Sequence, residues 1–119
     1  MDKLWLMVTQ KRKSGIKGEN AAIRYLSNEG YQIVRRNYRH SYCEIDLIAT
    51  KSDVLCFIEV KSRSSITYGY PEQFVGRKQM KCIMKAAGYY TDKNHWTGKI
   101  RFDIISILPG EIHHFEDAF

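Results

Sequence analysis

The sequence predicts a single mixed α/β domain, in which a central sheet is flanked by helices in the order α-β-β-β-α-β-β. Two segments repeat apolar residues at helical spacing, and five shorter segments carry the β-branched and aromatic residues typical of strands. The chain has 119 residues, whereas hydrophobic cores rarely divide below roughly 250 residues. We therefore expect one folding unit over residues 14–119, preceded by a short basic segment over residues 1–13.

The first helix is expected at about residues 16–28, because apolar residues recur at helical spacing from Ile16 to Leu26. Gly30 then supplies the left-handed conformation that commonly ends a helix. A first strand is expected over Tyr31–Arg39, where β-branched and aromatic residues partly alternate with polar ones.

Two further strands, Glu44–Thr50 and Val54–Ser62, are separated by the short polar turn Lys51-Ser52-Asp53. This spacing predicts a β-hairpin. The run Val54–Ile58 is continuously apolar, which indicates a central strand that is buried on both faces.

The second half of the chain is expected to hold a helix and two more strands. Ser62–Pro71 has no periodicity and is assigned to a loop. An amphipathic basic helix is expected over residues 76–90, followed by a turn-rich connector over residues 92–98. Strands are then predicted at Ile100–Leu108 and Ile112–Phe115.

The composition narrows the functional classes. A hydrophobic fraction of 44% with 27% charged residues excludes a disordered, collagen-like or coiled-coil chain. The 19 Lys and Arg residues outnumber the 13 Asp and Glu residues, which leaves a net charge of +6. This balance favours a polyanionic partner, with nucleic acid the foremost candidate.

The cysteines and the N-terminal segment bear on localisation. Cys43, Cys56 and Cys82 are odd in number and lack CxxC spacing, so we expect neither a disulfide framework nor a zinc site. The apolar run Leu4–Val8 is too short for a membrane span or an export signal. These features predict a cytoplasmic protein with reduced thiols and no membrane association.

The motif Glu44-Ile45-Asp46, followed by Glu59-Val60-Lys61, is the most informative part of the chain. Side chains two apart on a strand share a face, and an even-numbered turn sets Asp46 opposite Glu59 and Glu44 opposite Lys61. Opposed side chains have Cβ atoms about 4.5 to 5.5 Å apart. Paired carboxylates at that distance predict a divalent cation between them.

Mg²⁺ or Mn²⁺ is the expected cofactor, because hard cations take oxygen ligands and complete their shells with water and substrate phosphate. Lys61 would then orient or deprotonate the attacking water, or neutralise charge in the transition state. The alternative is a set of cross-strand ion pairs on a solvated face, which the same spacing also allows.

Two helix-borne residues belong to the same hypothesis. Glu19 lies on the apolar stripe of the first helix, where an acid needs a partner. The alternatives are a first-turn Glu favoured by the helix dipole or an ion pair to Lys61. Gln79 lies on the inward stripe of the second helix, and its alternative is an amide at the margin of an amphipathic face.

Taken together and in order, the motifs of this chain resemble the YraN family of predicted endonucleases. The resemblance covers about residues 14–119. It rests on these segments: Gly18-Glu19, Ala21-Ala22, Tyr25-Leu26, Gly30-Tyr31, Arg36-Asn37, Glu44-Ile45-Asp46-Leu47-Ile48-Ala49, Phe57-Ile58-Glu59-Val60-Lys61-Ser62-Arg63, Arg77-Lys78-Gln79, Arg101-Phe102-Asp103 and Ile112-His113-His114-Phe115-Glu116-Asp117-Ala118-Phe119.

That family is identified as a member of the restriction-endonuclease-like PD-(D/E)xK superfamily, similar to archaeal Holliday junction resolvases. The resemblance implies a nuclease-like domain in which Asp46, Glu59 and Lys61 match the catalytic core. It also implies that Glu19 matches the acidic residue of the first helix, a possible third metal ligand, and that Gln79 matches a helix-borne polar position. Two departures are Cys43, where the family usually has Gly, and Gln73-Phe74 in place of Ala-Val.

Basic residues suggest how nucleic acid would be held, although a solvated charged face is the alternative. The expected phosphate contacts are Arg36, Arg39, Arg63, Arg77, Lys78 and Lys81. No recognition-helix motif supports base-specific contacts, so structure-selective binding is expected. The four histidines have no shared metal-ligand spacing.

Three functional hypotheses follow from these observations. The first is a Mg²⁺- or Mn²⁺-dependent endonuclease acting on DNA, possible as a homodimer that addresses two strands. The second is a catalytically silent or partner-dependent nucleic-acid-binding module. The third is a protein-interaction adaptor that uses Trp5 and the Tyr-rich segment 68–70.

Overall fold

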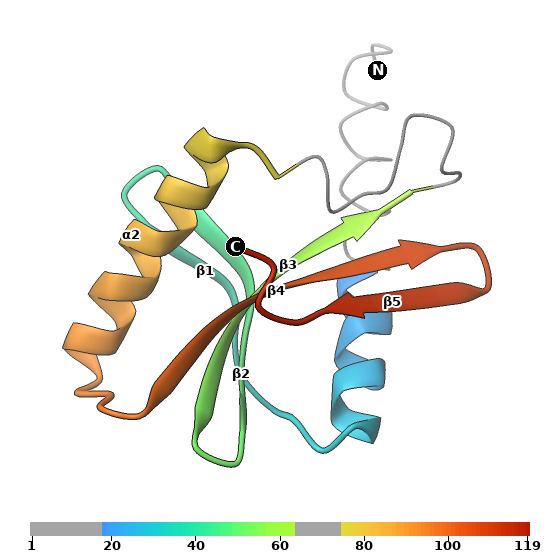
Figure 1. Ribbon diagram of the computed structural model, residues 1–119, viewed down its shortest axis with the longest axis horizontal. Helices are drawn as coiled ribbons and strands as arrows, with labels where there is room; N and C mark the ends of the chain where they lie inside the picture. The colour runs from blue at the N-terminus through green and yellow to red at the C-terminus, as the bar shows by residue number, and fades with distance from the viewer. Residues whose placement is uncertain (1–17, 64–74) are drawn as a thin grey trace, which may run out of the picture.

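The computed structural model describes residues 18–63 and 75–119, and these form a five-stranded mixed sheet with helices packed against it (Figure 1). The first helix covers residues 18–28 within the described part of the chain. The remaining elements are β1 (Gln32–His40), β2 (Cys43–Lys51), β3 (Val54–Ser62), α2 (Arg77–Lys93), β4 (Lys99–Leu108) and β5 (Glu111–Phe115).

The five strands lie side by side in chain order. Neighbouring strands are antiparallel except β3 and β4, which are parallel because α2 crosses over between them. The predicted mixed α/β class is confirmed, and the arrangement is compatible with a restriction-endonuclease-like fold. No helix in the described ranges is long and apolar enough to cross a membrane.

The helices and strands lie close to their predicted positions. α2 continues to Lys93 rather than ending near Tyr90, and the capping residue Asn94 donates from its backbone and its side chain to the Tyr90 carbonyl. Several sequence-based expectations fall outside the described residues: the segment 1–13, the helix start at Ile16, and residues 64–71 of the expected loop.

β3 is the central strand, and its alternating side chains divide the interior into two cores. Leu55 and Phe57 belong to the core beneath α2, whereas Cys56 and Ile58 belong to the core beneath the first helix. All four side chains are at most 1% exposed. The prediction that this strand is buried on both faces is therefore confirmed.

A buried ionic network joins β4 to β5 and to the C-terminal residues. Asp103 is fully buried and accepts hydrogen bonds from Arg101 (2.8 Å) and from the Asp117 backbone N–H (3.1 Å). His114 Nε2 lies 2.7 Å from the same carboxylate. Burial alone would raise the pKa of Asp103, but its partners outweigh burial and lower that pKa.

A disulfide between Cys43 at the start of β2 and Cys82 in α2 corrects the expectation of three reduced thiols. The two Cα atoms are 5.2 Å apart, although the residues are separated by 39 positions in the sequence. Chain spacing could not reveal this contact, because it forms only when α2 packs on the sheet. Cys56, buried in the opposite core, is the free cysteine.

We predict that reducing the Cys43–Cys82 bond lowers the free energy of unfolding by about 2 to 4 kcal/mol, because the cross-link restricts the unfolded chain. Thermal unfolding with and without a phosphine reductant measures the change. The double variant Cys43→Ser/Cys82→Ser is the control, since the reductant should leave its melting temperature unchanged.

Thiol titration of the denatured chain provides a second readout. With three cysteines in the sequence, one reactive thiol is expected before reduction and three afterwards. Three reactive thiols in unreduced protein purified under air would contradict the disulfide.

Candidate functional site

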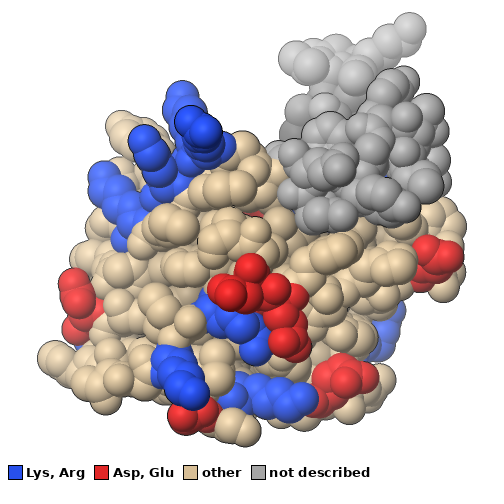
Figure 2. Space-filling view, viewed as in Figure 1, with Lys and Arg blue, Asp and Glu red and all other residues tan. Residues whose placement is uncertain are grey.

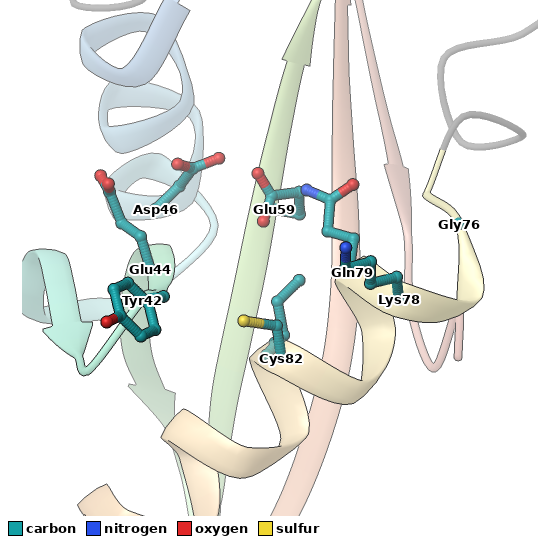
Figure 3. Close-up of a pocket in the computed structure, with 9 residues that line it drawn as sticks. Tyr42, Glu44, Asp46, Glu59, Gly76, Lys78, Gln79 and Cys82 are labelled. Carbon is teal, nitrogen blue, oxygen red and sulfur yellow. The ribbon is translucent and has the colours of Figure 1, made fainter.

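A pocket of about 610 Å³ lies between the sheet and the first half of α2 (Figure 3). Three carboxylates, those of Glu44, Asp46 and Glu59, line it from the strands. Gln79 lines it from α2. The sheet and the crossover helix therefore bring together residues from both predicted motifs.

Asp46 marks the point where β2 and β3 separate. The backbone register from Lys51–Val54 to Leu47–Ile58 is the one that the even-numbered turn predicts. Beyond Ile58 the ladder stops, and Asp46 Oδ2 instead accepts a hydrogen bond from the Val60 backbone N–H at 2.8 Å. The expectation that Asp46 and Glu59 form a directly opposed backbone pair is therefore wrong, although both side chains line the pocket.

A break in the side-chain alternation of β2 explains this separation. Ile45 and Ile48 both belong to the core beneath α2, whereas Leu47 belongs to the opposite core. On the neighbouring strand, Asn37 has a positive φ of 49°. The distortion turns the Asp46 carboxylate toward the backbone of β3, where it replaces the missing strand-to-strand hydrogen bond.

Glu59 is the buried acid of the site, with 8% of its surface exposed. Burial raises its pKa to about 9, and the hydrogen bond and negative charge of Asp46 add to the increase. The Lys61 ammonium acts in the opposite direction. Glu59 Oε2 has no hydrogen-bond partner among the described residues. At neutral pH this carboxyl therefore holds a proton unless a cation replaces it.

Lys61 follows Glu59 on the same face of β3, and its Nζ donates to Gln79 Oε1 across a long contact of 3.5 Å. Glu44 does not pair with Lys61 as the hairpin register predicts. Its carboxylate instead forms a 3.1 Å ion pair with Arg39, which is its backbone partner on β1. The early end of the β2–β3 ladder accounts for this exchange of partners.

Glu19 lies beside the pocket but does not line it. Its Oε2 accepts from Asn37 Nδ2 at 3.2 Å and lies 3.6 Å from an Arg36 nitrogen. Burial raises the pKa of Glu19, and the Asp46 charge contributes to the increase. The first helix can approach β3 closely because Gly18 has no side chain: a Cβ there would lie 3.2 Å from Ser62 Cβ.

The basic residues predicted to contact phosphate are only partly gathered at this site. Lys78 lines the pocket, and Arg77 and Lys81 are exposed on the same helix. Figure 2 shows Lys and Arg side chains clustered over α2.

The other basic residues of the prediction lie outside α2. Arg36 and Arg39 form ion pairs with Glu19 and Glu44, respectively. Arg63 is exposed just beyond β3.

The donor set is compatible with a hard divalent cation that two carboxylates would hold. In residues 18–63 and 75–119, no three Asp, Glu, His or Cys side chains gather into a metal-binding group. Mg²⁺ is often held by one or two carboxylates and completes its shell with water and phosphate oxygens. Asp46 and Glu59 meet that requirement, and the unpartnered Glu59 Oε2 is an available ligand atom.

Sequence reasoning missed several pocket residues. Glu44 was placed on the same face as Asp46 but given no role, although its position two residues earlier is a usable signal. Cys82 and Ile83 follow Gln79 by about one helical turn and line the same cavity. Tyr42 occupies the turn before β2, and turn residues give no periodicity from which to predict their orientation.

Comparison with known proteins identifies one matching family and several relatives of similar length. The model of the uncharacterised protein family UPF0102 matches residues 18–107. A UPF0102 protein of Persephonella marina is 43% identical over 88% of this chain and 91% of its own length. Similar proteins of Cytophaga hutchinsonii and Clostridioides difficile are each 42% identical, over 84% and 91% of this chain and 88% and 97% of their own lengths.

We predict that Glu59 makes the metal-free protein less stable as pH rises. Its folded pKa is raised from 4.5 to about 9, so its favourable contribution is complete below pH 4.5 and is lost toward pH 9. Between pH 5 and 8 in EDTA, wild type should lose roughly 2 to 4 kcal/mol of unfolding free energy relative to Glu59→Gln. Urea unfolding at both pH values measures this difference.

Glu44→Gln is the matched control, because this carboxylate lines the same pocket but is more exposed and paired with Arg39. Its stability should follow the wild-type pH dependence. Parallel pH profiles for wild type and Glu59→Gln would show that Glu59 does not take up a proton on folding.

Proposed function

This chain belongs to the uncharacterised protein family UPF0102, the YraN family that its motifs resemble, and we propose that it is a Mg²⁺- or Mn²⁺-dependent endonuclease that hydrolyses phosphodiester bonds of DNA. The observation that carries the proposal is the Asp46–Glu59 carboxyl pair, in which Glu59 of the central strand is buried with one unpartnered oxygen and Asp46 of β2 is half-buried beside it. A buried carboxyl oxygen without a protein partner is an atom to which a cation or a water molecule can bind.

Asp46 and Glu59 would hold the cation, whose chemistry when bound is to neutralise phosphate charge and acidify water. The Val60 N–H fixes the orientation of the Asp46 carboxylate at 2.8 Å. Glu19 does not line the pocket, but its charge interacts with that of Asp46. Its role in the proposal is to tune the negative charge of the pair.

Lys61 provides a positively charged group that can act on the attacking water and on the phosphate. Gln79 Oε1 accepts from its ammonium group, and the Lys61 charge lowers the pKa of Glu59. In this position Lys61 can orient the attacking water and stabilise negative charge as water adds to phosphorus and the P–O bond to the leaving oxygen breaks. Gln79 is a positioning residue, because it acts through Lys61.

The basic charge favours nucleic acid bound through its backbone, which we propose to be DNA. The chain carries a net charge of +6, and exposed basic side chains of α2 lie beside the pocket. Contacts of this kind bind phosphates without distinguishing bases. We therefore propose recognition of DNA structure rather than DNA sequence.

A second candidate is a nucleic-acid-binding module that does not cleave by itself. The observation in its favour is the raised pKa of Glu59, which keeps the carboxyl protonated at neutral pH until a cation or a partner replaces the proton. Binding that weakens steeply with salt, without metal-stimulated cleavage, would favour this candidate.

We predict metal-dependent cleavage that requires Asp46. Labelled single-stranded, duplex, flap and four-way-junction DNA should be cut with Mg²⁺ or Mn²⁺ but not with EDTA. Asp46→Asn should reduce the rate at least about 100-fold, because the amide can still accept the Val60 hydrogen bond but loses the charge that binds the cation. Gel analysis of initial rates measures the effect.

Asp53→Asn is the matched control, since Asp53 is an exposed residue of the turn at the opposite end of the hairpin. It should cleave at the wild-type rate. Equal cleavage by Asp46→Asn would assign the activity to a contaminant, and silence of the folded protein on every DNA would reject the nuclease.

A further inference from the structure

Tyr42 presents an aromatic ring to solvent at the edge of the pocket. It is 100% exposed, whereas no other exposed large hydrophobic residue among the described ranges exceeds 48%. It lies in the two-residue turn that joins β1 to β2, next to Ser41, which has a positive φ of 58°. Single exposed rings are common on protein surfaces, and what distinguishes Tyr42 is that it also lines the pocket that holds the carboxylates.

The turn that carries Tyr42 is held firmly on both sides. The next residue, Cys43, is bonded to Cys82 of α2 and pairs with His40 across the strands. The His40 ring stacks on Tyr89 of α2 with the ring centroids 3.9 Å apart. The backbone that carries Tyr42 is therefore held in place before any ligand arrives, so a contact with its ring needs only the side chain to be ordered.

The pocket has an acidic part and an uncharged part. Asp46 and Glu59 belong to the acidic part, where the proposed function places the cation and the phosphate. Tyr42, Cys82 and Ile83 form the uncharged part of the same cavity, and Glu44, which is paired with Arg39, lies beside Tyr42. Figure 3 shows Tyr42 across the pocket from Cys82 of α2. A nucleotide whose phosphate lies at the carboxylates would bring its base toward this uncharged part.

Only an unpaired base can occupy such a position. Bases within a duplex are stacked on their neighbours, whereas bases of single strands and branch points are free to stack on aromatic side chains. We propose that Tyr42 stacks on an unpaired base next to the phosphate that is cut, and thereby makes the site selective for DNA with a single-stranded or branched segment. This inference rests on the proposed function and names its substrate class.

Binding in Ca²⁺, a hard cation that carboxylates also hold, tests the stacking separately from cleavage, with the DNA checked on a gel to be uncut. Fluorescence anisotropy compares a labelled single strand with the same sequence as a blunt duplex, for wild type, Tyr42→Ala and Tyr42→Phe. Tyr42→Ala should bind the single strand about 10- to 100-fold more weakly, while its affinity for the duplex should change less than about twofold. Tyr42→Phe should retain the wild-type preference, because it keeps the ring.

A spectroscopic readout identifies the stacked base. 2-Aminopurine placed at successive positions of the single strand should be quenched at one position by wild type and Tyr42→Phe, and not by Tyr42→Ala. Because Tyr42 is fully exposed, its replacement should leave the melting temperature unchanged, which excludes misfolding as the cause.

The outcomes distinguish the two proposals. Selective loss in Tyr42→Ala without cleavage by any form would support stacking and reject the nuclease. Equal affinities of wild type and Tyr42→Ala for the single strand would overturn the stacking role even if cleavage is observed. Equal losses in Tyr42→Ala and Tyr42→Phe would also overturn it, because they would implicate the hydroxyl rather than the ring.

Discussion

The hydrogen bond from the Val60 backbone to the Asp46 carboxylate determines how the candidate site is built. β3 continues its pairing with β4 as far as Ser62, but its pairing with β2 ends at Ile58. A side chain thus completes the backbone hydrogen bonding of the central strand at the point where the pocket opens. One acidic residue thereby satisfies a structural requirement and contributes to the acidic end of the cavity, and only a substitution that keeps the accepting oxygen can alter the second role without the first.

The surroundings of this hydrogen bond show how the fold tolerates several carboxylates in a small volume. Asn37 donates to Glu19 from a backbone conformation that the distorted strand pair imposes, and Arg39 neutralises Glu44 at the rim. Asp46 accepts from the Val60 N–H instead of a cation, and the buried Glu59 compensates for its surroundings by remaining protonated. The acids of the site are therefore stabilised in three ways: ion pairs for Glu19 and Glu44, a backbone hydrogen bond for Asp46, and a proton for the buried Glu59.

Local patterns were sufficient to predict the layers of the fold, because apolar periodicity reports which faces are buried. The even-numbered turn at Ser52-Asp53 fixed the hairpin register, and the run Val54–Ile58 revealed the central strand. The exceptions depend on tertiary packing. The sequence could not show that Asp46 would leave the ladder, nor that α2 would bring Cys82 to Cys43. For Tyr42, a turn residue without a partner, orientation follows only from the packing of both neighbouring strands.

The disulfide has a consequence for the covalent topology of the site. The bond between Cys43 and Cys82 closes a ring of the chain that includes the β2–β3 hairpin and the beginning of α2. Of the five residues assigned to the chemistry, Asp46, Glu59, Lys61 and Gln79 lie within that ring, and only Glu19 lies outside it. A single peptide-bond cleavage between residues 44 and 81 would leave the two fragments joined through sulfur, so these four residues would remain in one covalent molecule until a reductant separated them.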